Sequence, residues 1–136
     1  MADAFPITIY HNPDCGTSRN ALALIDAAGY APTIVDYREE GWTRDQLKWL
    51  LTAMGARPHE ILREKGTPAV ELGLLGSSVP DDAIVAAMIG HPTLVNRPIV
   101  VTPKGAKLCR PSEVVLSLLD RTPARFVKED GQIVRP

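Results

Sequence analysis

The order of the first three predicted elements limits the fold of this chain more than any other feature of its sequence. The run FPITIY at residues 5–10 is rich in β-forming side chains, and TIVDY at residues 33–37 is a second run of this kind. Between them lies an alanine-rich apolar stretch at residues 18–28, which Gly29 follows, as glycine often follows a helix end. A strand, a helix and a second strand in this order favour parallel pairing and an α/β fold.

A helical block is predicted after the second strand. Its first helix has a capping box in Thr43 and Gln46, and its apolar residues recur on one face as far as Gly55. The acidic residues that follow Pro80 favour another helix start, because negative charge is stabilising at the positive end of the helix dipole. The predicted elements are a helix from Thr43 to Gly55, a shorter helix over residues 57–64, a loop over 66–80 and a helix over 81–90.

The following part of the chain predicts a β-hairpin and a helix. Residues 99–102 and 106–109 predict strands that a Pro-Lys-Gly turn joins, and Pro111 suits the first position of a helix. The polar tail after residue 123 is expected to be irregular. The complete order is β-α-β, a helical block and then β-β-α. This is the α/β, thioredoxin-like plan with a helical insertion between strands 2 and 3.

Composition and charge bear on the class of protein and its partners. With 136 residues the chain is expected to form a single domain over residues 1–136, and its formal net charge of -1 provides no field for nucleic acid or an anionic membrane. Its start lacks the pattern of a signal peptide, and no apolar run is long enough to span a bilayer. Two cysteines make no disulfide framework, and three scattered histidines offer no metal site. We therefore expect a cytoplasmic monomer.

The run YHNPDCGTSRNAL places Cys15 at the predicted junction of the first strand and the first helix. The N–H groups at a helix N-terminus have no intrahelical partner and the helix dipole is positive there, so both stabilise a thiolate and can hold an oxyanion. Gly16 allows a close approach of the backbone, Thr17 and Ser18 add hydroxyl donors, and a protonated His11 nearby would lower the thiol pKa. The alternatives are that Cys15 is a small core residue and that His11 only ends a strand.

Arginines are the candidate anion-binding groups. The phosphatase signature C-x5-R is excluded, because the residue six positions after Cys15 is Ala21, and Arg19 comes too early and is expected on the helix surface. Arg97 and Arg110 each precede a proline at the edge of a predicted strand, where the backbone is held extended. Guanidinium groups match oxyanions bidentately, which favours an anion site. The alternative is that both arginines are only solvated.

The sequence resembles the glutaredoxin-linked arsenate reductases of the thioredoxin-like superfamily. The resemblance lies in ITIYHNPDCGTSRNAL, ILREKG, HPTLVNRPIVVTPKGAKLCRPSEVVL and KEDG, and it covers residues 7–131. It implies that Cys15 is the catalytic nucleophile, that His11 helps to lower its pKa and that Ser18 supports the thiolate. It also implies that three arginines act on the arsenic oxyanion, namely Arg63, Arg97 and Arg110.

The same resemblance implies a mechanism and its partners. The Cys15 thiolate displaces an oxygen of arsenate, glutathione attacks the adduct, and glutaredoxin supplies the next thiol, so that arsenite leaves. The pattern C-x-x-S that ends at Ser18 agrees with this scheme, because it has no resolving cysteine. Glutathione is expected as a co-substrate, with no tightly bound cofactor. A cis peptide bond before Pro98 and a Cys109 that turnover does not need are further expectations.

Two other functions compete with this interpretation. Relatives in the superfamily are regulators that bind RNA polymerase and sense thiol stress, but these commonly carry C-x-x-C near the start. A glutathione-dependent reductase with a different substrate is the second alternative, because fold and family do not determine a substrate. Ser18 and the three arginines favour the arsenate reductase.

Overall fold

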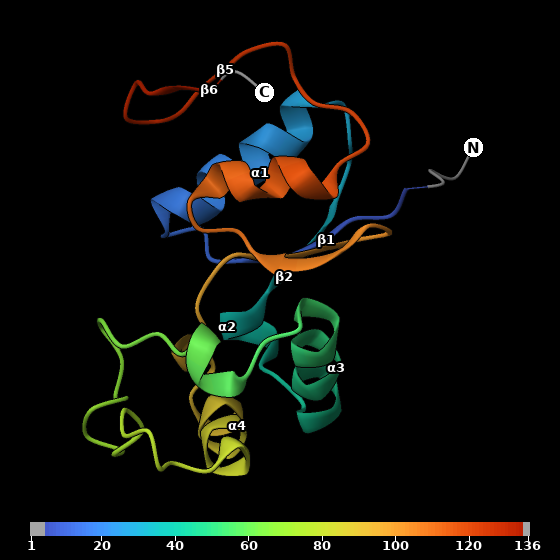
Figure 1. Ribbon diagram of the computed structural model, residues 1–136. Helices are drawn as coiled ribbons and strands as arrows, with labels where there is room; N and C mark the ends of the chain where they lie inside the picture. Colours follow the sequence, from blue (N-terminus) through green and yellow to red (C-terminus); the bar gives the residue numbers. More distant parts are fainter. Residues whose placement is uncertain (1–4, 135–136) are drawn as a thin grey trace. The chain divides into compact units, whose positions relative to one another are not determined.

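The computed structural model describes residues 5–134, and the chain forms two compact units (Figure 1). One unit comprises Met1–Asp36 with Arg97–Pro136, and the other comprises Tyr37–Asn96. The single domain over residues 1–136 stays a prediction. Within residues 5–134, no helix has the length and apolar character that crossing a membrane requires.

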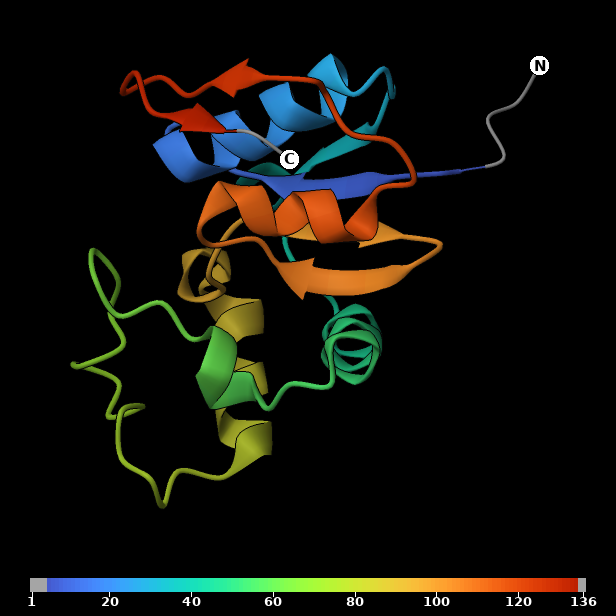
Figure 2. The ribbon, with the colours of Figure 1, turned by 45° about the horizontal axis from the view of Figure 1, so that its top comes forward.

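A four-stranded sheet in the order β2-β1-β3-β4 lies in the first unit (Figure 2). Its strands are β1 (Thr8–His11), β2 (Thr33–Asp36), β3 (Ile99–Thr102) and β4 (Gly105–Leu108), and α1 (Gly16–Ala27) connects β1 to β2. β1 pairs parallel with β2, and β3 pairs antiparallel with both β1 and β4. These pairings confirm the predicted β-α-β and β-β-α parts of a thioredoxin-like core.

The core of this unit is formed where α1 and η3 (Ser112–Leu118) pack against the sheet. Ile9 and Val100 from the strands and Leu24 from α1 are each 0% exposed there. The helix predicted after Pro111 is present as a 3-10 helix rather than an α-helix. A 3-10 helix has three residues per turn, so residues three apart face the same side. The buried residues of η3 follow this spacing, and they are Ser112, Val115 and Leu118.

The tail that was expected to be irregular contains a short antiparallel hairpin, β5 (Phe126–Val127) with β6 (Ile133–Val134). We call residues 126–134 the C-terminal hairpin; Figure 1 shows it in red near α1. Its turn is closed by the N–H of Lys128, which donates to the Gln132 carbonyl at 2.8 Å. The expectation of irregular structure is therefore wrong for these residues, because two short apolar strands lie on either side of a polar turn and the polar residues dominate the composition.

The second unit is helical, as predicted. Its helices are α2 (Tyr37–Glu40), α3 (Arg44–Met54), η1 (Pro58–Ile61), α4 (Asp81–Gly90) and η2 (Pro92–Leu94). The capping box of α3 is confirmed, because Thr43 Oγ1 accepts from the Gln46 N–H at 3.1 Å and Gln46 Oε1 accepts from the Thr43 N–H at 3.3 Å. Gly55 ends α3 with a φ of 64°, the left-handed conformation that glycine adopts most easily.

Two helices of this unit differ from the prediction. The helix expected over residues 57–64 is limited to η1, a 3-10 helix. α2 was not expected, because Tyr37 was assigned to the preceding strand. Tyr37 is instead buried, and its ring stacks on that of Trp42 with 5.3 Å between the ring centroids. Such aromatic packing is a tertiary contact that outweighs the strand preference of a single tyrosine.

Candidate active site

The first strand and the first helix meet at Cys15, as predicted. β1 ends at His11 and α1 begins at Gly16, so Cys15 is the N-cap residue, with an extended φ of -103° and ψ of 121°. Two hydrogen bonds shape the turn before it: Cys15 N–H donates to the Asn12 carbonyl at 3.0 Å, and Asp14 N–H donates to Asn12 Oδ1 at 2.9 Å. The Cys15 side chain is thereby placed at the helix end whose N–H groups have no intrahelical partner.

Opposing effects act on the thiol of Cys15, which is only 6% exposed. Burial raises the pKa of this thiol. The Ser18 N–H, the charge of Arg97, the Arg110 guanidinium and the Thr17 N–H lower it, and together they outweigh burial. The pKa of Cys15 therefore lies below its ordinary value. Because the thiolate is the nucleophilic form, this environment favours the reactive state of the sulfur.

Arg110 and Arg97 lie at this sulfur. Arg110 Nη1 donates to Cys15 Sγ at 3.7 Å, and the same nitrogen donates to the Arg97 carbonyl at 3.0 Å. Arg97 lies just before β3 and Arg110 just after β4. Because Ile99 at the start of β3 pairs with Leu108 at the end of β4, the antiparallel pairing brings the two arginines together. The peptide bonds before Pro98 and Pro111 are both cis, which confirms the expectation for Pro98. A thiol and two guanidinium groups thus form one candidate oxyanion site.

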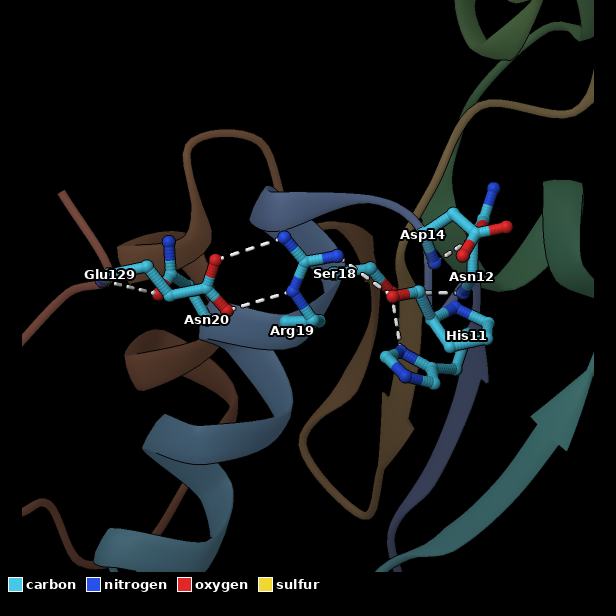
Figure 3. Close-up of polar contacts among 8 residues, drawn as sticks. His11, Asn12, Asp14, Ser18, Arg19, Asn20 and Glu129 are labelled. Carbon is cyan, nitrogen blue, oxygen red and sulfur yellow. Dashed lines mark hydrogen bonds and ion pairs between the residues drawn. The ribbon is translucent and has the colours of Figure 1, made fainter.

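His11 and Ser18 contact each other rather than acting separately. His11 Nδ1 and Ser18 Oγ are 2.6 Å apart, and Ser18 Oγ also accepts from the Asn12 N–H at 3.1 Å (Figure 3). Ser18 is fully buried. Its hydroxyl therefore joins the end of β1 to the first turn of α1, while its backbone N–H helps to lower the pKa of Cys15. The support of the thiolate by the Ser18 hydroxyl stays a prediction, and the contribution of Ser18 to the pKa of Cys15 comes from its backbone.

Arg63 belongs to the second unit, whereas Cys15, Arg97 and Arg110 belong to the first. It follows η1 and is half-buried. Its N–H donates to the Leu94 carbonyl at 2.7 Å, next to a bridge between Leu62 and Val95. The backbone of Arg63 is therefore held within its own unit, and its role at the oxyanion stays a prediction.

Cys109, the second cysteine, is fully buried, in agreement with its interpretation as a core residue. Burial raises the pKa of Cys109 to about 12, although the charge of Lys107 acts in the opposite direction. Its thiol donates to the Lys107 carbonyl at 3.6 Å. A thiol in such a site remains protonated at neutral pH and is a poor nucleophile.

One group of interacting residues near the active-site turn was not predicted from the sequence. Arg19 is partly exposed in the first turn of α1, as predicted, but its Nε and Nη2 donate to both carboxylate oxygens of Glu129, at 2.8 and 3.0 Å (Figure 3). Its Nη1 donates to the Pro13 carbonyl at 2.8 Å. Glu129 lies in the segment KEDG, which contributes to the family resemblance. That resemblance was the signal available, since no local pattern relates residues 110 positions apart.

Among residues 5–134, no group of three or more histidine, cysteine, aspartate or glutamate residues could hold a metal ion. The sequence matches the model of the ArsC family over residues 10–118. The chain belongs to the ArsC family.

Relatives and solved structures agree with this assignment. An arsenate reductase named ArsI2 from Synechocystis sp. is 57% identical over 129 residues, which cover 94% of this chain and 92% of the relative. The arsenate reductase of Escherichia coli (strain K12) is 52% identical with the same coverage. The solved structure of an arsenate reductase from Vibrio cholerae superposes with a TM-score of 0.81 at 41% identity, covering 86% of this chain and all of that one. The thioredoxin-like α/β fold is thereby confirmed.

Proposed function

We propose that this protein reduces arsenate to arsenite, with the Cys15 thiolate as the nucleophile. One observation carries the proposal: Arg110 Nη1 lies 3.7 Å from the sulfur of a cysteine whose pKa is lowered, at the N-terminus of α1. The site therefore offers a thiolate and positive charge to one oxyanion. Relatives that are 57% and 52% identical over 129 residues carry the name arsenate reductase, which supports arsenate as that oxyanion.

The first chemical step is a substitution at arsenic. The Cys15 sulfur forms a bond to arsenic, an arsenic–oxygen bond breaks, and the oxygen leaves as water after protonation. Arg97 and Arg110 stabilise the negative charge that develops on the remaining oxygens, and Arg63 is assigned to the same task on the family resemblance. The product is a covalent thiol-arsenate adduct, in which arsenic is still As(V).

Two external thiols complete the reduction. The glutathione sulfur forms a bond to arsenic in the adduct, a second arsenic–oxygen bond breaks, and this oxygen leaves as water after protonation. A glutaredoxin thiolate then attacks the glutathione sulfur, and the sulfur–arsenic bond breaks with its electron pair remaining on arsenic. The oxidised product is a mixed disulfide, and As(V) becomes As(III), which hydrolysis from Cys15 releases as arsenite. Glutathione is thus a co-substrate, and the scheme needs no tightly bound cofactor.

The two cysteines of the chain support the use of external thiols. Position 18 carries a buried serine hydroxyl in contact with His11, so it provides no resolving thiol. Cys109 is fully buried and its pKa is raised to about 12, so it is unsuited to attack an adduct at neutral pH. This dependence on reduced glutathione also favours the cytoplasm, where thiols are kept reduced.

The test is arsenite formation by the purified protein with glutathione and glutaredoxin. We expect wild type to form arsenite only when both thiols are present. Cys15→Ser should be inactive, because a serine hydroxyl stays protonated near neutral pH, and Cys109→Ser is the matched control that should retain activity. Residual activity of Cys15→Ser within about tenfold of wild type would exclude Cys15 as nucleophile. A large loss in Cys109→Ser would indicate an internal disulfide relay.

Arg97→Ala separates arsenate reduction from a general thiol reductase. Because the arginine is assigned to the oxyanion, its loss should reduce turnover of arsenate but leave reduction of a small disulfide by glutathione unchanged. Equal losses with both substrates would argue against an oxyanion role for Arg97. Retention of RNA polymerase on the immobilised protein, without arsenite formation, would instead favour the regulator.

A further inference from the structure

The C-terminal hairpin is attached to the segment that carries Cys15. Both carboxylate oxygens of Glu129 accept hydrogen bonds from the Arg19 guanidinium (Figure 3). The third nitrogen of that guanidinium donates to the Pro13 carbonyl in the active-site turn. The Glu129 N–H also donates to Asn20 Oδ1 at 3.2 Å. Arg19 follows Cys15 by four residues and Pro13 precedes it by two. The hairpin is therefore linked through two side chains of α1 to the segment after Cys15, and by way of Arg19 to the Pro13 carbonyl before it.

The neighbouring residue of the hairpin is attached to the segment that carries Arg110. Lys128 Nζ pairs with Glu113 Oε1 at 2.5 Å, and the Lys128 side chain is only 10% exposed. Glu113 also accepts from the Ser112 hydroxyl at 2.9 Å. It lies in the first turn of η3, three residues after Arg110. Lys128 and Glu129 thus connect the two segments that carry the nucleophile and its arginine.

The solvent exposure of the Arg19–Glu129 pair indicates whether the pair acts on stability or on geometry. The side chains of Arg19 and Glu129 are 44% and 48% exposed, and ion pairs at such exposure contribute little to the free energy of unfolding. A bidentate carboxylate does, however, restrict the orientation of a guanidinium group. The effect of the Arg19–Glu129 pair is therefore expected on the geometry of the turn rather than on the stability of the protein.

We propose that Lys128 and Glu129 are positioning residues that set the distance between Cys15 and Arg110. Glu129 binds the segment that carries Cys15, Lys128 binds the segment that carries Arg110, and the two residues are adjacent in the C-terminal hairpin. The proposal rests on the function proposed above for the site. It assigns a task to a segment that lies far along the chain from Cys15 and that contributes no group to the oxyanion. Loosening either attachment is expected to move Arg110 Nη1 away from the sulfur without removing any group from the site.

The test uses Glu129→Gln and Lys128→Met, with the pH dependence of Cys15 alkylation by iodoacetamide as the main readout and Cys15→Ser as the blank. The two substitutions have opposite charge effects. Loss of the Glu129 charge alone would ease ionisation of the thiol, and loss of the Lys128 charge alone would hinder it. Loss of positioning instead predicts that both variants move the midpoint to higher pH, because Arg110 no longer contacts the sulfur.

We expect kcat for arsenate to fall about tenfold in both variants, less than the roughly hundredfold that a misplacement of 1 Å can cost. Asp130→Asn is the matched control in the same turn and should behave as wild type, because its side-chain oxygen still accepts from the Gln132 N–H. Lys128→Arg should restore most of the activity, because it keeps the charge opposite Glu113. Thermal unfolding of each variant shows whether it is folded.

Midpoints that move in opposite directions, or that equal wild type, would overturn the positioning role. A loss of activity that only follows a loss of folded protein would do the same. The alkylation readout needs no arsenate, so it separates this proposal from the proposed function. If wild type forms no arsenite but both midpoints move to higher pH, the positioning role stands and the arsenate reductase does not.

Discussion

Cys15 depends on its neighbours for reactivity, because burial alone would keep its thiol protonated. Burial raises the pKa of Cys15, but the N–H groups of α1 and the charges of Arg97 and Arg110 outweigh it. The N–H groups of Thr17 and Ser18 belong to the first turn of the helix, and any cysteine at an N-cap position has such groups beside it. Arg97 and Arg110 flank β3 and β4, outside α1, so substitutions can remove their charges without altering the helix.

Arg110→Met tests this balance directly. The side chain keeps its length but loses its charge and its contact with Cys15 Sγ at 3.7 Å, so the pKa of Cys15 should rise. The pH midpoint of alkylation should therefore move to higher pH. Arsenite formation should fall by about a hundredfold or more, the usual cost of losing one donor to developing negative charge. Arg110→Lys, which keeps the charge, should lose less, and equal behaviour of both variants would contradict the charge argument.

The helix α3 shows how far local sequence controls an element. Its capping box, its buried face and its terminal glycine were all predicted, and each depends on residues within one or two turns. The N-cap hydrogen bond of Thr43 satisfies an N–H group that the helix itself cannot. The stability of this element is therefore expected to respond to a single side chain at its start.

Thr43→Ala should lower the free energy of unfolding by about 1 kcal/mol, the usual cost of removing an N-cap hydroxyl. Thr52→Ala in the same helix is the control, since the exposed Thr52 hydroxyl only donates to the Lys48 carbonyl one turn before it. That variant should remain within about 0.5 kcal/mol of wild type. Urea unfolding followed by circular dichroism measures both, and equal losses would show that the cap is not the cause.

Taken across the whole molecule, the two cysteines have opposite electrostatic environments. Cys15 caps a helix beside two arginines, whereas Cys109 lies in the core of the first unit with Ile9, Leu24 and Val100. Burial raises the pKa of Cys109 to about 12, while the pKa of a cysteine thiol in an unfolded chain is about 8.5. Between these two values the unfolded chain loses a proton that the folded chain keeps. Folding stability contributed by Cys109 is therefore complete below about pH 8.5 and is lost as the pH rises toward 12.

Cys109→Ala should remove this alkaline loss. We expect the unfolding free energy of wild type to fall relative to the variant by about 1.4 kcal/mol per pH unit above about pH 9, the slope for one proton. Other titrating groups, Cys15 included, are shared by both proteins and cancel in the difference. Urea unfolding in the presence of a reductant, from pH 7 to pH 10, provides the measurement. A difference that stays constant with pH would show that Cys109 ionises as readily in the folded protein.

Local patterns in the sequence were sufficient for most of the elements and for the position of Cys15 at the start of a helix. The β-α-β order, the capping box of α3 and the place of Cys15 before α1 depend on residues close together in the chain, so side-chain preferences express them directly. The 3-10 form of η3 and the presence of α2 were not predicted, because they depend on how side chains pack against other elements.

The assembly of the site required the folded chain. Arg110 meets Cys15 across 95 positions of sequence, and Glu129 meets Arg19 across 110. The sequence pattern marked Arg110 as a candidate, but its contact with the sulfur depends on the pairing of β3 with β1 and β4. No local pattern in the sequence indicated a partner for Glu129, because an exposed ion pair produces no periodic pattern of residues. The strands of the C-terminal hairpin, β5 and β6, are also only two residues long. Contacts of this kind arise from chain topology, which brings together groups whose local sequences are independent of each other.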